Sequence, residues 1–381
     1  MKKKELIIFS EYFLPKLGGV ERYTDKLITE LKRKYNITIV TTELDNIDNY
    51  EENDNVRIFR IPVFKIFKNR YALIKKNKQL KKIIAKLNET KYDFLICQTR
   101  FFPTSYFGVK YAKKKKIPVM VIEHGSSHFT VNNKILDYFG SIYEHWLTRK
   151  IKKNCHLFYG VSERCNLWLK HFKIESNGVL YNSIDHKDYE KYKDKYYFKK
   201  NKKEINICFA GRLIKEKGVY ELCDAFNKLS NDYKNIKLQI AGDGPIFQDL
   251  TKKYLNNKKI NFLGKLNFDN VMALYNSCDI FVYPSMYPEG LPTSILEAGL
   301  MKCAIVATDR GGTVEVITHK QDGLICEENT ESIYENIKYL LDNPSMINDY
   351  SEQIHRRITK YFTWSVTAKK LANIVENESK K

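Results

Sequence analysis

The sequence predicts an α/β protein made of two domains, each with an open parallel sheet, and three observations support this. The chain has 381 residues, more than a single hydrophobic core usually holds. Short β-branched runs alternate with helical patterns in both halves. A charged stretch without periodicity, residues 186–204, separates the two alternations. Strands that alternate with helices form parallel sheets covered on both faces, so we expect two such sheets.

The first half of the chain opens with a strand and repeats the pattern of strand, helix, strand. We expect strands at 6–10, 37–42, 56–61, 93–98, 119–124 and 157–162. Between them, apolar spacing predicts helices at 21–34, 71–87, 104–115 and 163–172. This half is therefore expected to be a Rossmann-like domain.

The second half resumes the alternation after the charged stretch, in which we place the linker. Expected strands are 205–210, 237–241, 260–263, 280–283, 304–307 and 323–326, and expected helices are 219–229, 246–255, 269–276 and 294–301. A second Rossmann-like domain follows. Neither first strand is followed by Gly-x-Gly-x-x-Gly, which argues against an NAD or FAD enzyme.

Composition limits where the protein works and which classes of site it carries. No apolar run is long enough to span a bilayer, and the apolar stretch within residues 1–10 is too short for a signal peptide, so we expect a cytoplasmic protein. The eight cysteines are scattered without a Cys-x-x-Cys pair, which indicates reduced core thiols.

Positive charge is concentrated between Arg57 and Lys116, where eighteen basic residues face only Glu89 and Asp93. Apolar residues at 73, 74, 80, 83, 84 and 87 lie between lysines. Such a segment is either a basic amphipathic helix lying on an anionic membrane, or a helix whose apolar side packs on the sheet. Nucleic-acid binding has little support, because no aromatic groove motif or zinc spacing accompanies the charge.

Ligands of open α/β sheets bind at the carboxyl ends of strands, so loops there are the candidate sites. In the first half these loops contain Gly18 and Gly19, whose backbone amides can approach a phosphate, and His124, which can bond to a sugar hydroxyl. Taken alone, a glycine turn and a structural histidine remain alternatives.

In the second half, Gly211 and Arg212 follow one strand, and Lys217 comes five residues later at the start of a helix. Two cations and the amides of a helix N-terminus form a cradle for a diphosphate. Each cation alone is more often an exposed, solvated charge. The turn Gly242, Asp243 and Gly244, together with a second turn at 264–266 that includes Leu266, suits a flat nucleobase.

Residues 284–298 hold Glu289 and Glu297 eight positions apart, with a helix beginning between them. Carboxylates accept hydrogen bonds from vicinal hydroxyls, so the two acids can hold a sugar and a ribose. Gly290, Leu291, Pro292 and Thr293 form the turn between them. Either glutamate alone could be a helix-capping or exposed charge.

In combination these motifs resemble glycosyltransferase family 4 of the GT-B fold, a retaining group that uses nucleotide sugars. The resemblance covers nearly the whole chain. It implies an acceptor-binding domain at 1–184, a nucleotide-sugar-binding domain at 185–361, and a final helix within 362–381 that packs back on the first domain.

The resemblance also implies roles for single residues. Arg212 and Lys217 would hold the diphosphate, and the Gly19 amide would lie beside its distal phosphate. Glu289 would bind donor-sugar hydroxyls, Glu297 would bind the ribose, and His124 would meet the donor sugar.

No Asp-x-Asp occurs, so we expect neither a metal nor another cofactor, and cations must stabilise the leaving diphosphate. The expected function is retaining transfer of a hexose from a UDP- or GDP-sugar to a glycan or polyprenyl-linked acceptor, in bacterial surface polysaccharide biosynthesis. The expected place is the inner face of the membrane, bound through the 57–116 region. The alternatives are a GT-B sugar-nucleotide epimerase or a non-catalytic basic protein that binds membranes or nucleic acid.

Overall fold

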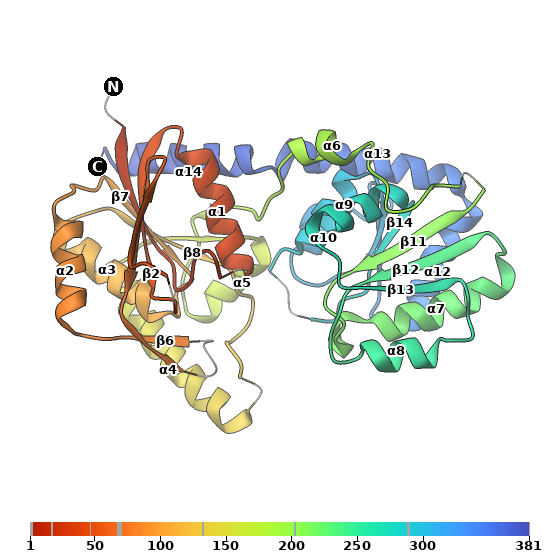
Figure 1. Ribbon diagram of the computed structural model, residues 1–381, viewed down its shortest axis with the longest axis horizontal. Helices are drawn as coiled ribbons and strands as arrows, with labels where there is room; N and C mark the ends of the chain where they lie inside the picture. Colours follow the sequence, from red (N-terminus) through yellow and green to blue (C-terminus); the bar gives the residue numbers. More distant parts are fainter. Residues whose placement is uncertain are drawn as a thin grey trace. The chain divides into compact units, whose positions relative to one another are not determined.

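A computed structural model describes residues 3–16, 18–45, 47–66, 71–131, 133–201, 203–287 and 290–380. It divides into two compact units, Met1–Asn182 with Trp364–Lys381, and Ser183–Thr363. The expected boundaries, 184 and 361, lie two residues from these divisions. Each unit is an α/β domain with its own sheet, as Figure 1 shows, which confirms the predicted fold class.

The sheet of the first unit has eight strands in the order β10-β9-β8-β7-β1-β2-β4-β3. All neighbours are parallel except β3 and β4. The strands are β1 Lys4–Phe9, β2 Tyr35–Thr42, β3 Tyr50–Asn53, β4 Val56–Ile61, β7 Phe94–Gln98, β8 Val119–Glu123, β9 Leu157–Gly160 and β10 Gly178–Val179.

Helices cover both faces of this sheet because successive strand residues point to opposite sides. Leu6 and Ile8 of β1 belong to a core cluster that includes residues of α1 and α14, whereas Ile7 and Phe9 belong to a second cluster. The helices are α1 Gly19–Leu31, α2 Lys78–Asn88, α3 Pro103–Lys115, α4 Lys134–Lys152, α5 Glu163–His171 and α14 Trp364–Glu378.

The expected helix at 71–87 is wrong in its first part. Residues Tyr71–Ile74 form strand β6, which pairs with β5, Val63–Ile66, in a separate antiparallel ribbon. The helix begins only at Lys78, because the Asn77 side chain caps it by accepting from the Leu80 amide at 2.9 Å. Helix α4 was not expected from the sequence.

The second unit has an all-parallel sheet in the order β13-β12-β11-β14-β15-β16. Its strands are β11 Ile205–Ala210, β12 Ile236–Ala241, β13 Ile260–Gly264, β14 Ile280–Tyr283, β15 Ala304–Thr308 and β16 Leu324–Cys326. Its α-helices are α6 Lys187–Tyr192, α7 Val219–Asp232, α8 Phe247–Lys253, α9 Phe268–Ser277, α10 Thr293–Leu300, α11 Thr313–Val316, α12 Thr330–Asp342 and α13 Pro344–Tyr361. The stretch expected as an irregular linker thus contains a helix, α6.

The chain enters and leaves the second unit at neighbouring points. Ile184 pairs with Thr363 in an isolated bridge, and the Ile184 amide donates to the Phe362 carbonyl at 3.0 Å. Helix α14 then packs against α1 in the first unit (Figure 1).

All eight cysteines are buried, as expected for core thiols, and none forms a disulfide. Among the described residues, no helix is both long enough and apolar enough to cross a bilayer.

Candidate functional site

Three loops of the second unit meet at the carboxyl edge of its sheet. They follow β11, β12 and β14, which are neighbours in the sheet. The Leu213 amide donates to the Asp243 carbonyl at 2.9 Å, and the Met286 amide donates to the Glu216 carbonyl at 2.8 Å. These bonds fix the three loops to one another, so residues far apart in the sequence form one surface.

Close backbone packing makes two glycines indispensable in these loops. Gly218 and Gly242 have φ of +67° and +151°, which side-chain-bearing residues rarely adopt. A Cβ at Gly218 would lie 2.0 Å from the Pro284 carbonyl oxygen, and one at Gly242 would lie 1.9 Å from the Gly211 carbonyl oxygen. The loops approach each other at distances that only glycine permits.

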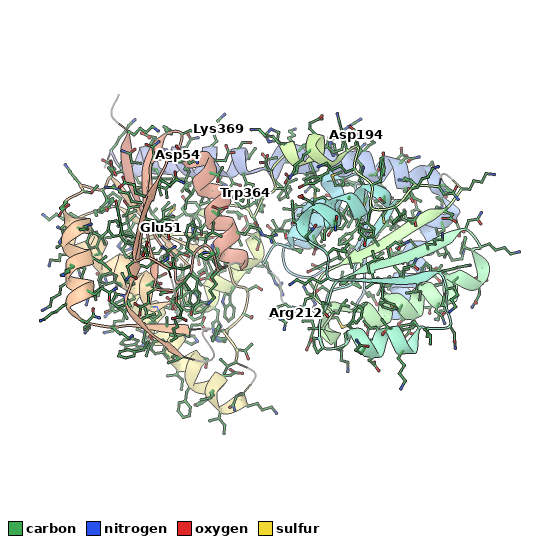
Figure 2. All side chains as sticks on the ribbon, in the orientation of Figure 1. Glu51, Asp54, Asp194, Arg212, Trp364 and Lys369 are labelled. Carbon is green, nitrogen blue, oxygen red and sulfur yellow. The ribbon has the colours of Figure 1, made fainter. Side chains whose placement is uncertain are left out.

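The two predicted cations have different surroundings. Arg212 is exposed on the loop after β11 (Figure 2), and within the described part of the chain its guanidinium has no hydrogen-bond or ion-pair partner. Lys217 is half-buried immediately before α7, and its Nζ donates to the Tyr283 hydroxyl at 3.1 Å. Lys217 is therefore held in place, whereas Arg212 is available to a ligand.

The segment after β14 leads into helix α10. Gly290 accepts a bond from the Gly312 amide at 2.6 Å, Leu291 and Pro292 are buried, and Thr293 is the first residue of the helix. Glu297 lies one turn into α10 and is half-buried. The other predicted acid, Glu289, lies outside the described residues.

The turn expected at the nucleobase is organised by the neighbouring strand. The Gly242 amide donates to the Gly264 carbonyl at 2.8 Å. Asp243 is exposed, and its Oδ1 accepts from the Gly244 amide at 2.7 Å. Leu266, just after β13, is half-buried. The structure therefore places these turns beside the loop that carries Arg212.

In the first unit, Gly18 and Gly19 lie at the start of α1. Gly18 is the N-cap with an extended φ of −148°, and Gly19 is the first helical residue. A Cβ at Gly19 would meet no atom within 4 Å. The fold itself thus does not require glycine at position 19.

His124 directly follows β8 and is held by two neighbours. Its Nε2 is 2.7 Å from Gln98 Oε1, and the Tyr23 ring packs edge-on with a centroid distance of 4.7 Å. Burial lowers the pKa of His124 to about 3, so the imidazole is neutral at physiological pH. The His124 Nδ1 has no hydrogen-bond partner among the described residues, so it is the ring nitrogen that can meet a ligand.

A buried carboxyl group that sequence reasoning missed lies close to the end of β1. The Glu11 side chain accepts from the Ala72 amide at 2.9 Å and from the Thr104 hydroxyl at 2.8 Å. Burial raises its pKa to about 7, and these hydrogen bonds only partly oppose the shift. No sequence signal marks Glu11, because its partners come from β6 and α3.

A second missed feature is a buried ion-pair network around Arg100. The guanidinium is fully buried and lies 2.6 Å from Glu144 and 3.3 Å from Glu123. Glu123 also accepts bonds from the amides of His124 and Gly125, at 3.2 and 3.0 Å. Removing Arg100 would leave two carboxylates buried without a cation, so the network holds the turn that carries His124.

The apolar side of α2 faces the core. Leu80, Ile83 and Leu87 are buried, which is the sheet-packing alternative left open by the sequence. The apolar surface is found instead on α4, which Figure 1 shows projecting from the sheet of this unit. Ile135, Tyr138 and Phe139 are between 62% and 70% exposed.

A pocket of about 320 Å³ opens beside the exposed part of α4. Its walls are almost entirely apolar and include Tyr71, Leu73, Phe101, Phe129, Leu136 and Phe139. Farther along α4, Trp146 stacks on the lining residue Tyr143. Lys150 lies over the Trp146 ring at 5.7 Å, and Lys110 of α3 lies over the ring of Tyr106, which is near Trp146. Apolar, aromatic and basic groups therefore share this surface.

Comparison with known proteins gives two family matches. The model "Glycosyltransferase Family 4" matches residues 17–188, and "Glycosyl transferases group 1" matches residues 190–357. An uncharacterized glycosyltransferase of Methanocaldococcus jannaschii is 30% identical over 390 residues, with 99% of each chain covered.

One further relative has a lipid-linked acceptor in its name, and one solved structure shares the fold. N,N'-diacetylbacillosaminyl-diphospho-undecaprenol alpha-1,3-N-acetylgalactosaminyltransferase of Campylobacter jejuni is 28% identical over 291 residues, covering 73% of this chain and 74% of that protein. Anabaena HepE, crystallised with UDP, matches with a TM-score of 0.73 at 14% identity, covering 99% of this chain and 100% of that one. These similarities favour neither the epimerase nor the nucleic-acid-binding alternative.

Proposed function

Because the chain belongs to glycosyltransferase family 4 of the GT-B fold, we propose that it transfers a hexose with retention from a UDP- or GDP-sugar to a lipid-linked or glycan acceptor. The observation that carries the proposal is the carboxyl edge of the second sheet. There, glycine-dependent loops present an exposed Arg212 beside a fixed Lys217. An edge of this kind suits a nucleoside diphosphate.

The donor's charge determines the roles of these groups. When the sugar leaves, negative charge grows on the diphosphate, and Arg212, Lys217 and the N-terminal amides of α7 would stabilise it. These are positive groups of the chain itself, so we propose transfer without a metal on the diphosphate. The departing phosphate then takes the proton of the acceptor hydroxyl from the same face of the sugar.

On the proposed acceptor side, the first unit offers Gly19, His124 and the apolar surface of α4. Gly19 is exposed at the N-terminus of α1, so its amide can donate to a phosphate, and the neutral His124 can accept from a sugar hydroxyl through Nδ1. Glu297 is assigned to the ribose and Glu289 to the donor-sugar hydroxyls.

We place the acceptor's lipid at the apolar pocket beside α4. The relative from Campylobacter jejuni, whose name specifies an undecaprenol-linked acceptor, supports this choice of chemistry. Helices α3, within the 57–116 region, and α4 also carry basic residues, and these would meet anionic headgroups. We therefore propose peripheral binding at the inner face of the cell membrane, in surface polysaccharide synthesis.

The first experiment is isothermal titration calorimetry of the full chain with UDP, GDP and their hexose conjugates in the presence of a chelator. The expected result is binding of one nucleotide class, weakened at least tenfold in Arg212→Ala and Glu297→Ala. Arg356→Ala and Glu335→Ala are matched controls, since both residues are exposed in the same unit. Binding that appears only when excess magnesium is added would contradict the metal-free mechanism, and no nucleotide binding with or without magnesium would overturn the proposed function.

A further inference from the structure

Three histidines from separate segments meet in the first unit, one of them in the loop that also carries His124. His128 lies in the loop between β8 and α4, His145 lies in α4, and His171 is the last residue of α5. One ring nitrogen of each lies within 4.8 Å of a ring nitrogen of the other two. Neutral imidazole is the most common protein ligand of zinc and similar ions, so this convergence has a specific chemical meaning.

The closest pair already has the spacing of two ligands on one ion. Nε2 of His145 and Nε2 of His171 are 3.2 Å apart. An ion at the usual zinc–nitrogen distance of about 2.0–2.1 Å from both would give an angle of about 100° between them, close to tetrahedral. The ligand nitrogen of His128 must move toward those of His145 and His171 by about 1.5 Å at most to reach the same spacing. His171 is exposed and His128 is half-buried, so side-chain rotation can supply this.

His128 has the outer-shell partner that metal-binding histidines usually have. Its Nδ1 lies 2.8 Å from Glu144 Oε2, and the other oxygen of Glu144 is 2.6 Å from the Arg100 guanidinium. A carboxylate that accepts from Nδ1 fixes the tautomer and leaves the Nε2 lone pair for an ion. Because Glu144 is itself held by a buried cation, the His128 ring is oriented before any ion binds.

Aromatic side chains pack against the His171 imidazole. The Trp168 ring stacks on His171 with a centroid distance of 4.7 Å and an angle of 6°, and Phe172 packs edge-on against the same imidazole. One side of the cluster is thus a rigid aromatic wall.

We propose that His128, His145 and His171 bind one divalent zinc ion, with water completing a tetrahedral site. Imidazole ligands favour zinc over magnesium or calcium, which prefer oxygen. The proposal departs from the sequence-based expectation that the protein binds no metal. It is separate from the diphosphate, whose cradle belongs to the second unit.

Zinc at this position would fasten three elements together. It would tie the loop after β8 to α4 and to the end of α5. The loop begins at the His124–Gly125 turn, whose amides donate to Glu123, and Arg100 pairs with both Glu123 and Glu144. Only four residues of α4 are buried, all in its second half, so an added anchor at His145 would steady this helix.

The test is a titration of chelator-treated, untagged full-length protein with zinc chloride, followed by calorimetry. We expect one zinc per chain, no binding of magnesium, and a rise in Tm of a few degrees for the zinc-loaded protein. His171→Ala and His145→Ala should each weaken zinc binding at least a hundredfold. His156→Ala is the matched control, because His156 is also exposed in the same unit and no ion pair or hydrogen bond of its ring is found among the described residues.

Cobalt substitution provides a second readout that does not depend on stability. A tetrahedral cobalt complex of three imidazoles should absorb in the visible range in the wild type and lose this absorption in His171→Ala. Absence of zinc binding, or equal weakening in His171→Ala and His156→Ala, would overturn the proposal. Nucleotide binding is measured separately in chelator, so failure here leaves the transferase proposal intact.

Discussion

The candidate sites of the two units are formed by different kinds of chemical groups. The second unit uses backbone: its loops are locked by amide–carbonyl bonds and by glycines that no larger residue can replace. The first unit uses buried charged side chains, namely Glu11, Arg100, Glu123 and Glu144, and an exposed apolar helix. A site formed by backbone groups suits a part of the ligand that does not vary between substrates, such as a diphosphate. Side chains can change while the fold is kept, which suits acceptors that vary.

The strongest test of this contrast exchanges glycine for alanine in both units. Gly242→Ala should destabilise the second unit by about 4 kcal/mol, because strain at positive φ adds to a backbone clash. Gly19→Ala should leave stability nearly unchanged. All three tryptophans belong to the first unit, so far-UV circular dichroism should report the loss in Gly242→Ala while the tryptophan fluorescence transition stays in place. Equal stability of the two variants would contradict the contrast.

The next effect is on turnover. Arg212→Ala should lower kcat by a hundred- to a thousandfold, about 3 kcal/mol, because the leaving diphosphate loses a positioned cation. The fold should be unaffected, since Arg212 is exposed. Steady-state assays with the donor identified by calorimetry would check this, with Arg356→Ala as the control. A loss below threefold would show that the diphosphate is stabilised elsewhere.

A third prediction concerns pH and the buried Glu11 in the first unit. A carboxyl whose pKa is raised from 4.5 to about 7 favours folding fully below pH 4.5, and this contribution disappears as pH rises through 7. The change amounts to about 3 kcal/mol and should be absent in Glu11→Gln. His124, with its lowered pKa, has the opposite slope, so variant and wild type are compared at each pH by urea unfolding and tryptophan fluorescence. Parallel curves would exclude a protonated Glu11.

The smallest expected effect sharpens the role of α4. Replacing Tyr138 and Phe139 by serine should change stability by less than about 0.5 kcal/mol, because both are largely exposed. Binding to vesicles that contain anionic phosphatidylglycerol should weaken about tenfold, from loss of apolar area at the lipid surface. Leu255→Ser, an equally exposed change in the second unit, is the control. If the variant with serine at Tyr138 and Phe139 binds the vesicles as well as Leu255→Ser does, the membrane-binding surface lies elsewhere on the protein.

Local pattern alone determined much of the fold. The strands around 205–210, 237–241 and 280–283 were predicted correctly, because buried parallel strands are continuous apolar runs, and glycine turns follow the first two of them. The positions of Arg212 and Lys217 at a strand end followed from the same reading. Both rest on interactions between residues that are close in the sequence.

Only the tertiary structure decided the rest. Tyr71–Ile74 is a strand because it pairs with β5, and the apolar side of α2 is buried because the sheet covers it. The partners of Arg100 and the meeting of His128, His145 and His171 bring together residues from several elements. Periodicity indicates which face of a segment is apolar, but it does not say what that face or a buried charge will contact. That depends on chain packing across long sequence separations, which one sequence read locally does not contain.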